Sequence, residues 1–317
     1  MIFTRAKRLR ARGIMGMNQR NVDFVAAHNP RHLYPLVDNK LKTKLLAQQA
    51  GIAVPKLLGT LQYQHDVKQL HSQLLPHEKF VIKPAKGSGG KGILVIAERE
   101  HEIYFKPSEE AISHETLEVH ATNILSGLYS LSGTPDTVMI EAMVQAHSIF
   151  TPYSFEGVPD IRVIVFQGYP VMAMLRLATR ASDGKANLHQ GAVGVGIDLT
   201  TGRALHAVQH DRPIYKHPDT QQVFSDLQIP NWDQLLLLAA SCSEVTGLGY
   251  LGVDIVIDKD HGPLILELNA RPGLAIQMAN GTGLTPRLEK IKTLVSQYRN
   301  AQSRAQLSKE LFAKSST

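Results

Sequence analysis

The sequence predicts an α+β fold, because pairs of adjacent strands joined by short turns alternate with helical segments. Two hairpins carry this prediction: one joins residues 161–166 to 171–177 around Gly168, and the other joins residues 250–257 to 263–268 across the turn DKDHG. Such hairpins argue against a single doubly wound parallel sheet. At 317 residues, of which 43% are hydrophobic, the chain can bury a core in one large domain or in two to three lobes.

The other elements are predicted from caps, turn residues and apolar periodicity. Residues 21–37 contain Pro30 and Pro35 and are predicted as loop or short strand. A helix is predicted to begin after Asp38 and to end at Gly51, ahead of Pro55. The later elements are strands at 80–83, 92–97 and 138–143, a helix beginning after Ser108, a leucine-rich helix from Asn231 to near Gly247, and a long amphipathic helix at 286–312.

Composition limits the class of protein. The single cysteine, Cys242, excludes a disulfide framework and fits a reducing compartment. No run approaches the ~18 to 20 consecutive apolar residues that a membrane span needs. The basic start MIFTRAKRLRARG leads into no apolar segment of a secretory signal. We therefore expect a cytoplasmic protein.

The net charge of +6 lies entirely in residues 1–20. Of the 34 basic residues six lie there without any acidic residue, so the rest of the chain balances 28 basic against 28 acidic residues. Two interpretations remain: a solvated N-terminus, which we favour, or an arm for an acidic partner or membrane surface. Without an aromatic platform or a known nucleic-acid module, no sequence-specific nucleic-acid binding is expected. A homo-oligomer stays open.

The sharpest chemical signal is the hairpin LGVDIVIDKDHGPLILELNARPG. A four-residue loop at 259–262 would set Asp254 opposite Glu267, with Asn269 on the same face. The opposite face would be entirely apolar, formed by Val253, Ile255, Ile257, Leu264, Leu266 and Leu268. Two carboxylates and an amide oxygen are hard ligands, which favour Mg²⁺ (or Mn²⁺) over zinc. The alternative is a pair of ordinary carboxylates on the wet face of a hairpin.

A glycine-rich stretch, PAKGSGGKG, lies between two predicted strands. Small residues let the backbone approach phosphate oxygens, and successive N–H groups can bind an anion. The residues expected to do so are Gly87, Ser88, Gly89 and Gly90. The stretch lacks the Walker A pattern, so we interpret it as a flap over a triphosphate, with Lys83 at the end of the preceding strand. Lys86 and Lys91 are expected to be mobile electrostatic helpers.

Five strings, in order, extend these signals along the chain: DNKLKTKLLAQQAGIAVP, VIKPAKGSGGKGI, DIRVIVF, ANLHQGA and GVDIVI with LILELNARPGL. From about Asp38 to Gly283 the sequence resembles the ATP-grasp superfamily and, within it, the alpha-L-glutamate ligases. The resemblance implies an ATP-grasp fold of two α+β lobes that clasp ATP. It implies a basic arm and vestigial segment at 1–37 in place of a full preceding domain, a lobe with the flap at 38–140, and a lobe with the metal site and C-terminal helix at 141–317.

The resemblance also implies roles for individual residues. Lys40 and Lys83 would bind ATP phosphates. Glu141 would receive the adenine amino group or the ribose, beside the backbone of Ala142 and Met143. The other implied contacts are Asp160 and Asn187 to the nucleotide, Asp254, Glu267 and Asn269 to Mg²⁺, and Arg162, Arg176 and Arg271 near the acyl phosphate and the substrate carboxylate.

The function that the sequence predicts is a Mg-ATP-dependent carboxylate–amine ligase, which forms an amide through an acyl phosphate. Its substrates would be a small-molecule or peptide carboxylate and an amine. Transfer of glutamate itself is in doubt, because RASDGKANLHQ stands where relatives have a basic run. Two alternatives stay open: a carboxylate kinase or thioester-forming ligase, and a nucleotide-binding regulatory module without turnover.

Overall fold

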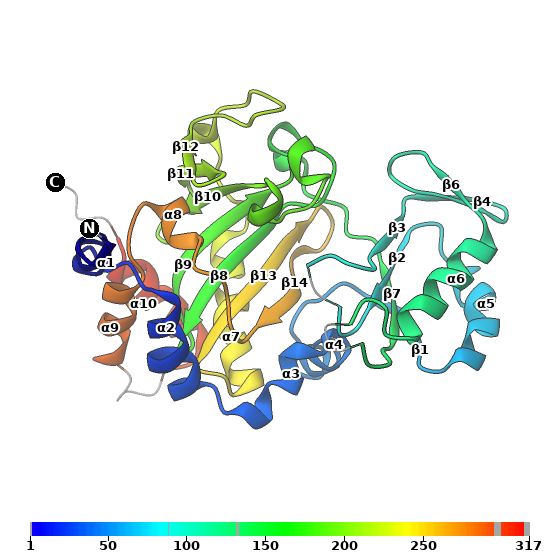
Figure 1. The fold of residues 1–317 in the computed structure, drawn as a ribbon, viewed down its shortest axis with the longest axis horizontal. Helices are drawn as coiled ribbons and strands as arrows, with labels where there is room; N and C mark the ends of the chain where they lie inside the picture. The colour runs from blue at the N-terminus through cyan, green and yellow to red at the C-terminus, as the bar shows by residue number, and fades with distance from the viewer. Residues whose placement is uncertain (1, 88, 131–132, 295–298, 314–317) are drawn as a thin grey trace. The chain divides into compact units, whose positions relative to one another are not determined.

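A computed structural model describes residues 2–87, 89–130, 133–294 and 299–313. The chain folds into two compact units. The first contains Met1–Asp38, Leu45–Ala53 and Gln145–Thr317, and the second contains Asn39–Lys44 and Val54–Val144. Figure 1 shows the helices and strands of both units.

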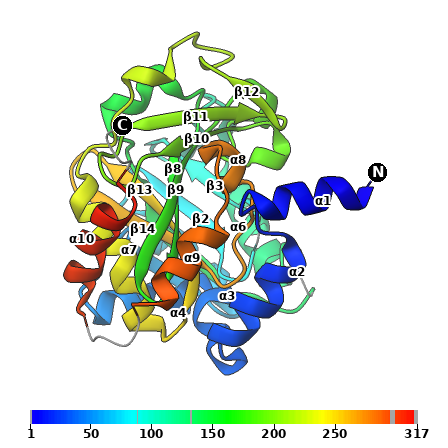
Figure 2. The ribbon, with the colours of Figure 1, turned by 90° about the vertical axis from the view of Figure 1, so that its left-hand side faces the viewer.

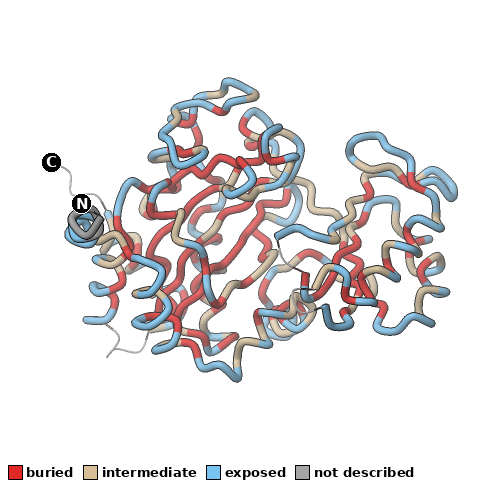
Figure 3. Tube along the Cα trace, in the orientation of Figure 1, coloured by how far each residue is buried: buried red, intermediate tan, exposed pale blue. Residues whose placement is uncertain are grey.

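The first unit is built on a seven-stranded antiparallel sheet in the order β12-β11-β10-β9-β8-β13-β14. Its strands are β8 (Asp160–Phe166), β9 (Tyr169–Leu177), β10 (Val193–Ile197), β11 (Ala204–Gln209), β12 (Arg212–Ile214), β13 (Tyr250–Asp258) and β14 (Gly262–Asn269). Both predicted hairpins are confirmed as β8–β9 and β13–β14. The central strands are almost fully buried (Figure 3).

The pairing of Asp254 with Glu267 agrees with the prediction, although the loop between β13 and β14 differs from the predicted one. Asp254 does lie opposite Glu267, but Asp258 lies opposite Gly262, so the loop is one residue shorter than predicted. An irregularity after Asp254 offsets this slip, as a β-bulge does. Between the loop and this irregularity the register is shifted, so Leu264 pairs with Val256 and not with a residue of the predicted apolar face, and that part of the prediction was wrong.

Helices cover both faces of this sheet (Figure 1). Helices α7 (Trp232–Thr246) and α10 (Ala301–Leu311) pack together on one face, and α8 (Ile276–Asn280) packs on β9, β10 and β11 on the other. The leucine-rich helix is confirmed as α7, which is followed by Gly247 in the left-handed conformation. The prediction of a single long C-terminal helix at 286–312 was wrong. Helix α9 (Thr285–Lys292) ends, and Asn300 begins α10 by accepting a hydrogen bond from the Ser303 N–H.

The N-terminal segment is helical and belongs to the first unit. It contains α1 (Ile2–Ala11), α2 (Met17–Gln19), a π-helical turn at Arg20–Ala26, a 3₁₀ turn at Arg31–Leu33 and α3 (Pro35–Asp38). The prediction of loop or strand for 21–37 was wrong, because Pro30 and Pro35 stand where helical turns begin, a position that tolerates proline. Phe24 and Val25 are buried in the core with Phe166.

The basic residues of this segment differ in their surroundings. Residues 7–12 are exposed, and α1 projects from the helices that follow it (Figure 2). From Met15 onward the segment is part of the fold, since Met15 is buried and its N–H donates to Gln277 Oε1 at 2.8 Å. The solvated interpretation therefore applies to residues 7–12 and not to all of residues 1–20.

The second unit has a four-stranded antiparallel sheet in the order β1-β7-β2-β3 and a smaller sheet β4-β5-β6. The strands are β1 (Leu57–Leu61), β2 (Phe80–Pro84), β3 (Leu94–Ile96), β4 (Glu98–Glu100), β5 (Ile103–Phe105), β6 (Ala111–Ile112) and β7 (Val138–Ala142). Helices α5 (Leu70–Leu74) and α6 (His114–Leu125) accompany them, and α4 (Lys40–Gln49) begins in this unit. The core includes Phe80, Ile82 and Leu117.

The helix predicted to begin after Ser108 begins five residues later. Residues 111–112 form β6, and Glu109 has a positive φ of 64°, which a helix does not allow. Ser113 is the N-cap and accepts a hydrogen bond from the Thr116 N–H. Across the described ranges of the chain, none of the helices is both long enough and apolar enough to cross a bilayer.

Candidate active site

Four charged residues form a ladder across three strands of the first unit. Asp160 and Arg162 are on β8, Arg176 is on β9, and Asp254 is on β13. The register sets Asp160 opposite Arg176 and Arg162 opposite Asp254, so all four side chains share one face of the sheet. We call these four residues the Asp–Arg ladder.

Ion pairs link every step of the Asp–Arg ladder. Arg176 forms a two-point pair with Asp160, with Nη2 to Oδ2 at 2.6 Å, and Arg162 does the same with Asp254, also at 2.6 Å. Arg176 Nη2 also lies 2.9 Å from Asp254 Oδ2. Such planar two-point pairs hold both partners in fixed orientations.

Burial and charge act in opposite directions on the two ladder carboxyls. Burial raises the pKa of Asp160 to about 6, with Arg176 opposing the rise and Asp254 adding to it. Burial would also raise the pKa of Asp254, but Arg162 and Arg176 outweigh it and hold that pKa below its ordinary value. The pKa of Arg176 is raised, because Asp160 and Asp254 outweigh its burial. Asp254 is therefore a fixed anion.

The three predicted metal ligands lie together beside the Asp–Arg ladder. Glu267 is opposite Asp254, and Asn269 is opposite Gly252 and donates from Nδ2 to Asp254 Oδ2 at 3.3 Å. The donor set of two carboxylates and one amide oxygen fits a hard divalent cation. Within the ranges the structure describes, there is no cluster of three His, Cys, Asp or Glu side chains placed to hold a metal, and both oxygens of Asp254 already accept from arginines. The metal assignment stays a prediction.

The loop after β14 is attached to the N-terminal segment. Asn29 is buried and donates from Nδ2 to the carbonyls of Tyr250 (2.8 Å) and Ala270 (3.1 Å). Arg20 donates from Nη1 to the Pro272 carbonyl at 2.8 Å. Sequence analysis missed Arg20 and Asn29, because it predicted their surroundings to be a terminal arm or loop.

Gly252 allows the same loop to lie close to β13. An added Cβ at this position would lie only 2.6 Å from Pro272 Cβ, so a larger side chain would displace the loop. The predicted Arg271 is in this loop, exposed, and its guanidinium lies 5.0 Å from the centre of the Tyr34 ring. Such a cation–π contact holds the arginine outside the Asp–Arg ladder.

Asn187 lies in the connection between β9 and β10. Its Oδ1 accepts from the His189 N–H at 3.0 Å and so caps a 3₁₀ turn, Leu188–Gln190. The structure thus gives this residue a local capping role, and its contact with a nucleotide stays a prediction.

A buried charge cluster occupies the second unit. Glu141 on β7 contacts Lys83 on β2, with Oε2 to Nζ at 2.7 Å, and also contacts Lys44 on α4, with Oε1 to Nζ at 3.1 Å. Exposed fractions are 3% for Glu141, 7% for Lys83 and 5% for Lys44. Burial lowers the pKa of Lys44 from 10.5 to about 8, with Glu141 opposing and Lys83 adding to the effect. We call these three residues the Lys–Glu–Lys cluster.

Lys44 was missed by sequence analysis. The helix reads KLKTKLL, in which Lys40, Lys42 and Lys44 look alike. Only the fold separates them, since Lys42 is exposed whereas Lys44 is buried and also donates to the Pro55 carbonyl.

The base of the glycine flap is tied to α4. Lys40 donates from Nζ to the Gly87 carbonyl and from its N–H to the Ala85 carbonyl at 2.8 Å. Gly89 and Gly90 have positive φ values of 62° and 76°, and an added Cβ at either would meet nothing within 4 Å, which leaves their backbone accessible. Ser88, which was predicted to contact phosphate, lies outside the described residues.

Two other predicted contacts have partners of their own. Lys86 is exposed and donates from Nζ to the Pro135 carbonyl at 2.9 Å, and its role as a mobile helper stays a prediction. The Ala142 N–H donates to the Lys56 carbonyl at 2.9 Å, and Met143 follows directly. The adenine contact predicted here therefore depends on the remaining backbone groups.

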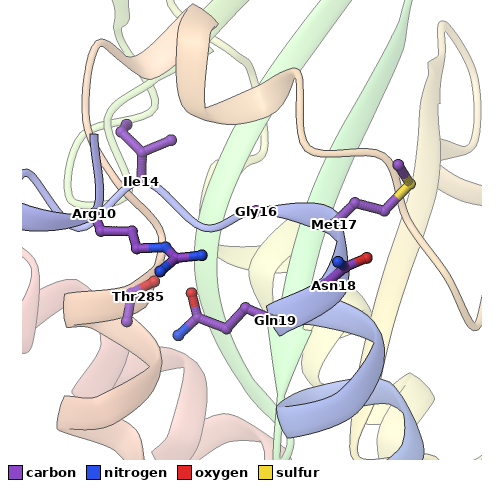
Figure 4. A pocket seen from close by; sticks show the side chains of 7 residues that line it. All are labelled: Arg10, Ile14, Gly16, Met17, Asn18, Gln19 and Thr285. Atoms are coloured by element: carbon purple, nitrogen blue, oxygen red, sulfur yellow. The ribbon is translucent and has the colours of Figure 1, made fainter. Parts of the chain in front are cut away.

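A separate pocket of about 570 Å³ lies where α1, α2 and α9 meet. Figure 4 shows the side chains of Arg10 and Gln19 extending into the space beside Thr285. None of its lining residues was predicted as a site residue.

Comparison with known proteins supports the resemblance. A model of the family described as sugar-transfer associated ATP-grasp matches residues 19–293. A probable alpha-L-glutamate ligase of Ectopseudomonas mendocina is 25% identical over 74% of this chain and 56% of its own length. A second, of Thioalkalivibrio sulfidiphilus, is 23% identical over 79% of this chain and 61% of its own length. This chain thus spans less than two thirds of these relatives. A crystal structure of D-cycloserine synthetase is similar at 16% identity and a TM-score of 0.45, over 84% of this chain and 72% of that one.

Proposed function

This chain belongs to the sugar-transfer associated ATP-grasp family, and from that premise we propose that it is a Mg-ATP-dependent ligase that joins a carboxylate to an amine. The substrate carboxylate attacks the γ-phosphate of ATP, ADP leaves, and an amine then displaces phosphate from the acyl phosphate. The substrates are proposed to be small molecules or peptides. The probable alpha-L-glutamate ligases among the relatives support this reaction class.

The observation that carries the proposal is the shared face of Asp254, Glu267 and Asn269 beside two arginines. We assign these three residues as the ligands of Mg²⁺, which when bound would neutralise phosphate charge. Arg162 and Arg176 keep Asp254 ionised and oriented. We further assign Arg176 to the charge of the acyl phosphate, and Arg271 to binding of the substrate outside the Asp–Arg ladder.

The Lys–Glu–Lys cluster and the flap supply the proposed triphosphate contacts of the second unit. Glu141 holds Lys83 at the end of β2, directly before the flap whose base Lys40 contacts. A lysine fixed by a buried carboxylate is a well-placed point charge for phosphate oxygens. The other proposed nucleotide contacts are the backbone of Ala142 and Met143 and, in the first unit, Asp160 and Asn187.

The experiment is a screen of amino acids and short peptides for ADP release, with mass spectrometry of the products. The proposal expects ADP only when a carboxylate and an amine are both present, and a product whose mass is their sum less water. Release of ADP without an amine, with an acyl phosphate that hydroxylamine traps, would instead indicate a carboxylate kinase. Nucleotide binding without turnover on every substrate would indicate a regulatory module.

Two variants connect the reaction to the assigned residues. Glu267→Ala should lower ATP turnover by about 100-fold, because it removes a ligand for the charge-neutralising cation. Glu289→Ala, which alters an exposed carboxylate on α9, is the control. Lys83→Ala should weaken nucleotide binding more than Lys91→Ala in the flap. Turnover of Glu267→Ala at the wild-type rate would refute the metal assignment.

A further inference from the structure

A second basic site lies in the first unit, beside the loop that follows β14. Its pocket has a volume of about 500 Å³, and Arg20, Arg31 and Arg271 line it together with Asn21 and Tyr34. The volume is within the range of pockets that bind small molecules. We call this site the arginine pocket.

Two of its guanidinium groups are held in place before any ligand binds. Arg20 donates from Nε and Nη2 to Asn21 Oδ1, at 3.1 and 2.8 Å, and from Nη1 to the Pro272 carbonyl. A guanidinium carries five N–H donors, so two remain for a ligand. Arg271 is held over the Tyr34 ring. Groups ordered in advance lose little conformational freedom when a ligand binds.

The positive charge of the arginine pocket is not balanced by an acidic side chain in its lining. None of its lining residues is acidic, and across the described ranges of the chain no ion pair is formed by these three arginines. Elsewhere in the same unit Arg162 and Arg176, whose side chains are 12% and 15% exposed, are both paired with aspartates. Three arginines that line one concave site favour an oxyanion, since a planar guanidinium fork matches carboxylate and phosphate.

The pocket adjoins the proposed active site through the backbone. Arg271 is two residues beyond Asn269, and Pro272, which accepts from Arg20, packs on Gly252 opposite Asn269. The same short loop therefore connects the proposed metal ligands to the arginine pocket.

We propose that the arginine pocket binds a second oxyanion group of the ligase substrate, a carboxylate or a phosphate distinct from the carboxylate that reacts. That the bound molecule is a ligase substrate rests on the proposed function. That the pocket binds an anion rests on the pocket alone. It places the substrate among small molecules or peptides that carry at least two anionic groups.

The test is calorimetric titration of the full chain with glutarate and, separately, with glycerol 3-phosphate, both with Mg-AMPPNP present at saturation. At least one probe should bind, and the stronger one identifies the group as carboxylate or phosphate. Arg31→Gln and Arg31→Gln/Arg271→Gln should weaken that binding progressively, the double variant by about tenfold or more. Arg212→Gln, an exposed arginine on β12, is the matched control and should bind as the wild type does.

Binding and turnover separate the two proposals. If neither probe binds, or if the double variant binds as tightly as the wild type, the arginine pocket is not an anion site, whatever the turnover. If probe binding depends on the arginines while no carboxylate and amine release ADP, the pocket stands and the ligase proposal fails. Unchanged Mg-AMPPNP affinity in the double variant shows that the loss is local.

Discussion

The Asp–Arg ladder and the Lys–Glu–Lys cluster stabilise buried charge in different ways. The ladder pairs two carboxylates with two guanidinium groups, so its formal charge is balanced. The cluster places two lysines on one carboxylate, so it has a positive excess, which the loss of a proton from Lys44 relieves above its lowered pKa of about 8. Arginine cannot lose its proton in proteins whereas lysine can, so the two cations of the ladder are fixed and a cation of the cluster can be lost.

The largest effect is expected from breaking the ladder. Asp254→Ala leaves Arg162 and Arg176, both largely but not fully buried, beside each other without their shared carboxylate. The free energy of unfolding should fall by about 3–5 kcal/mol, as when a buried pair loses one partner. Urea unfolding measures it, with the exposed Asp260→Asn as control. A loss under about 1 kcal/mol would show that the ladder behaves like a surface pair.

A smaller effect is expected from Glu141→Gln in the Lys–Glu–Lys cluster. The variant leaves two buried lysines without a carboxylate, but a lysine can shed its proton and so limit the cost. We expect a loss of about 2–3 kcal/mol by the same urea measurement, against Glu100→Gln on exposed β4. If Glu141→Gln proves more costly than Asp254→Ala, the comparison between the two clusters is wrong.

The pH dependence of the cluster has a definite sign. Lys44 has a pKa of about 8 in the folded chain and 10.5 unfolded, so between these values the unfolded chain binds more protons. Stability should therefore rise with pH across this window, by on the order of 2 kcal/mol, relative to Lys44→Met. Unfolding of both proteins at pH 7.5 and pH 10 measures the difference. Parallel curves would mean that Lys44 titrates normally.

The smallest effect concerns packing beside the ladder. Gly252→Ala adds a methyl group 2.6 Å from Pro272 Cβ and should cost about 1–2 kcal/mol. Gly273→Ala, in the same loop, meets nothing within 4 Å and should be nearly neutral. Thermal unfolding compares the two. Equal melting temperatures would show that the loop does not depend on its contact with Gly252.

The ladder and the cluster also differ in how far the sequence predicts them. Strand alternation placed Asp254, Glu267 and Asn269 on one face, because a two-residue period is visible in the sequence. The loop length was wrong, and the irregularity after Asp254 compensated for it, which no local pattern signals. The fold class and the main hairpins followed from the same alternation.

Lys44 and the N-terminal segment needed the tertiary structure. Helix periodicity does not show which lysine of KLKTKLL faces a buried carboxylate from a strand about a hundred residues away. Likewise Phe24 enters the core from a short helical turn, and the prolines that follow it, Pro30 and Pro35, resemble helix breakers in the sequence. Contacts between distant parts of the chain decide both cases, and they also create the arginine pocket.

The central claim is that an acyl phosphate forms, and an isotope measurement tests it most directly. The carboxylate substrate found in the screen is labelled with ¹⁸O in both oxygens and allowed to react with ATP and the amine. Because one carboxylate oxygen becomes the bridge to phosphorus and leaves with it, the released inorganic phosphate should carry one ¹⁸O atom. Unlabelled phosphate, or label appearing in AMP, would contradict this account.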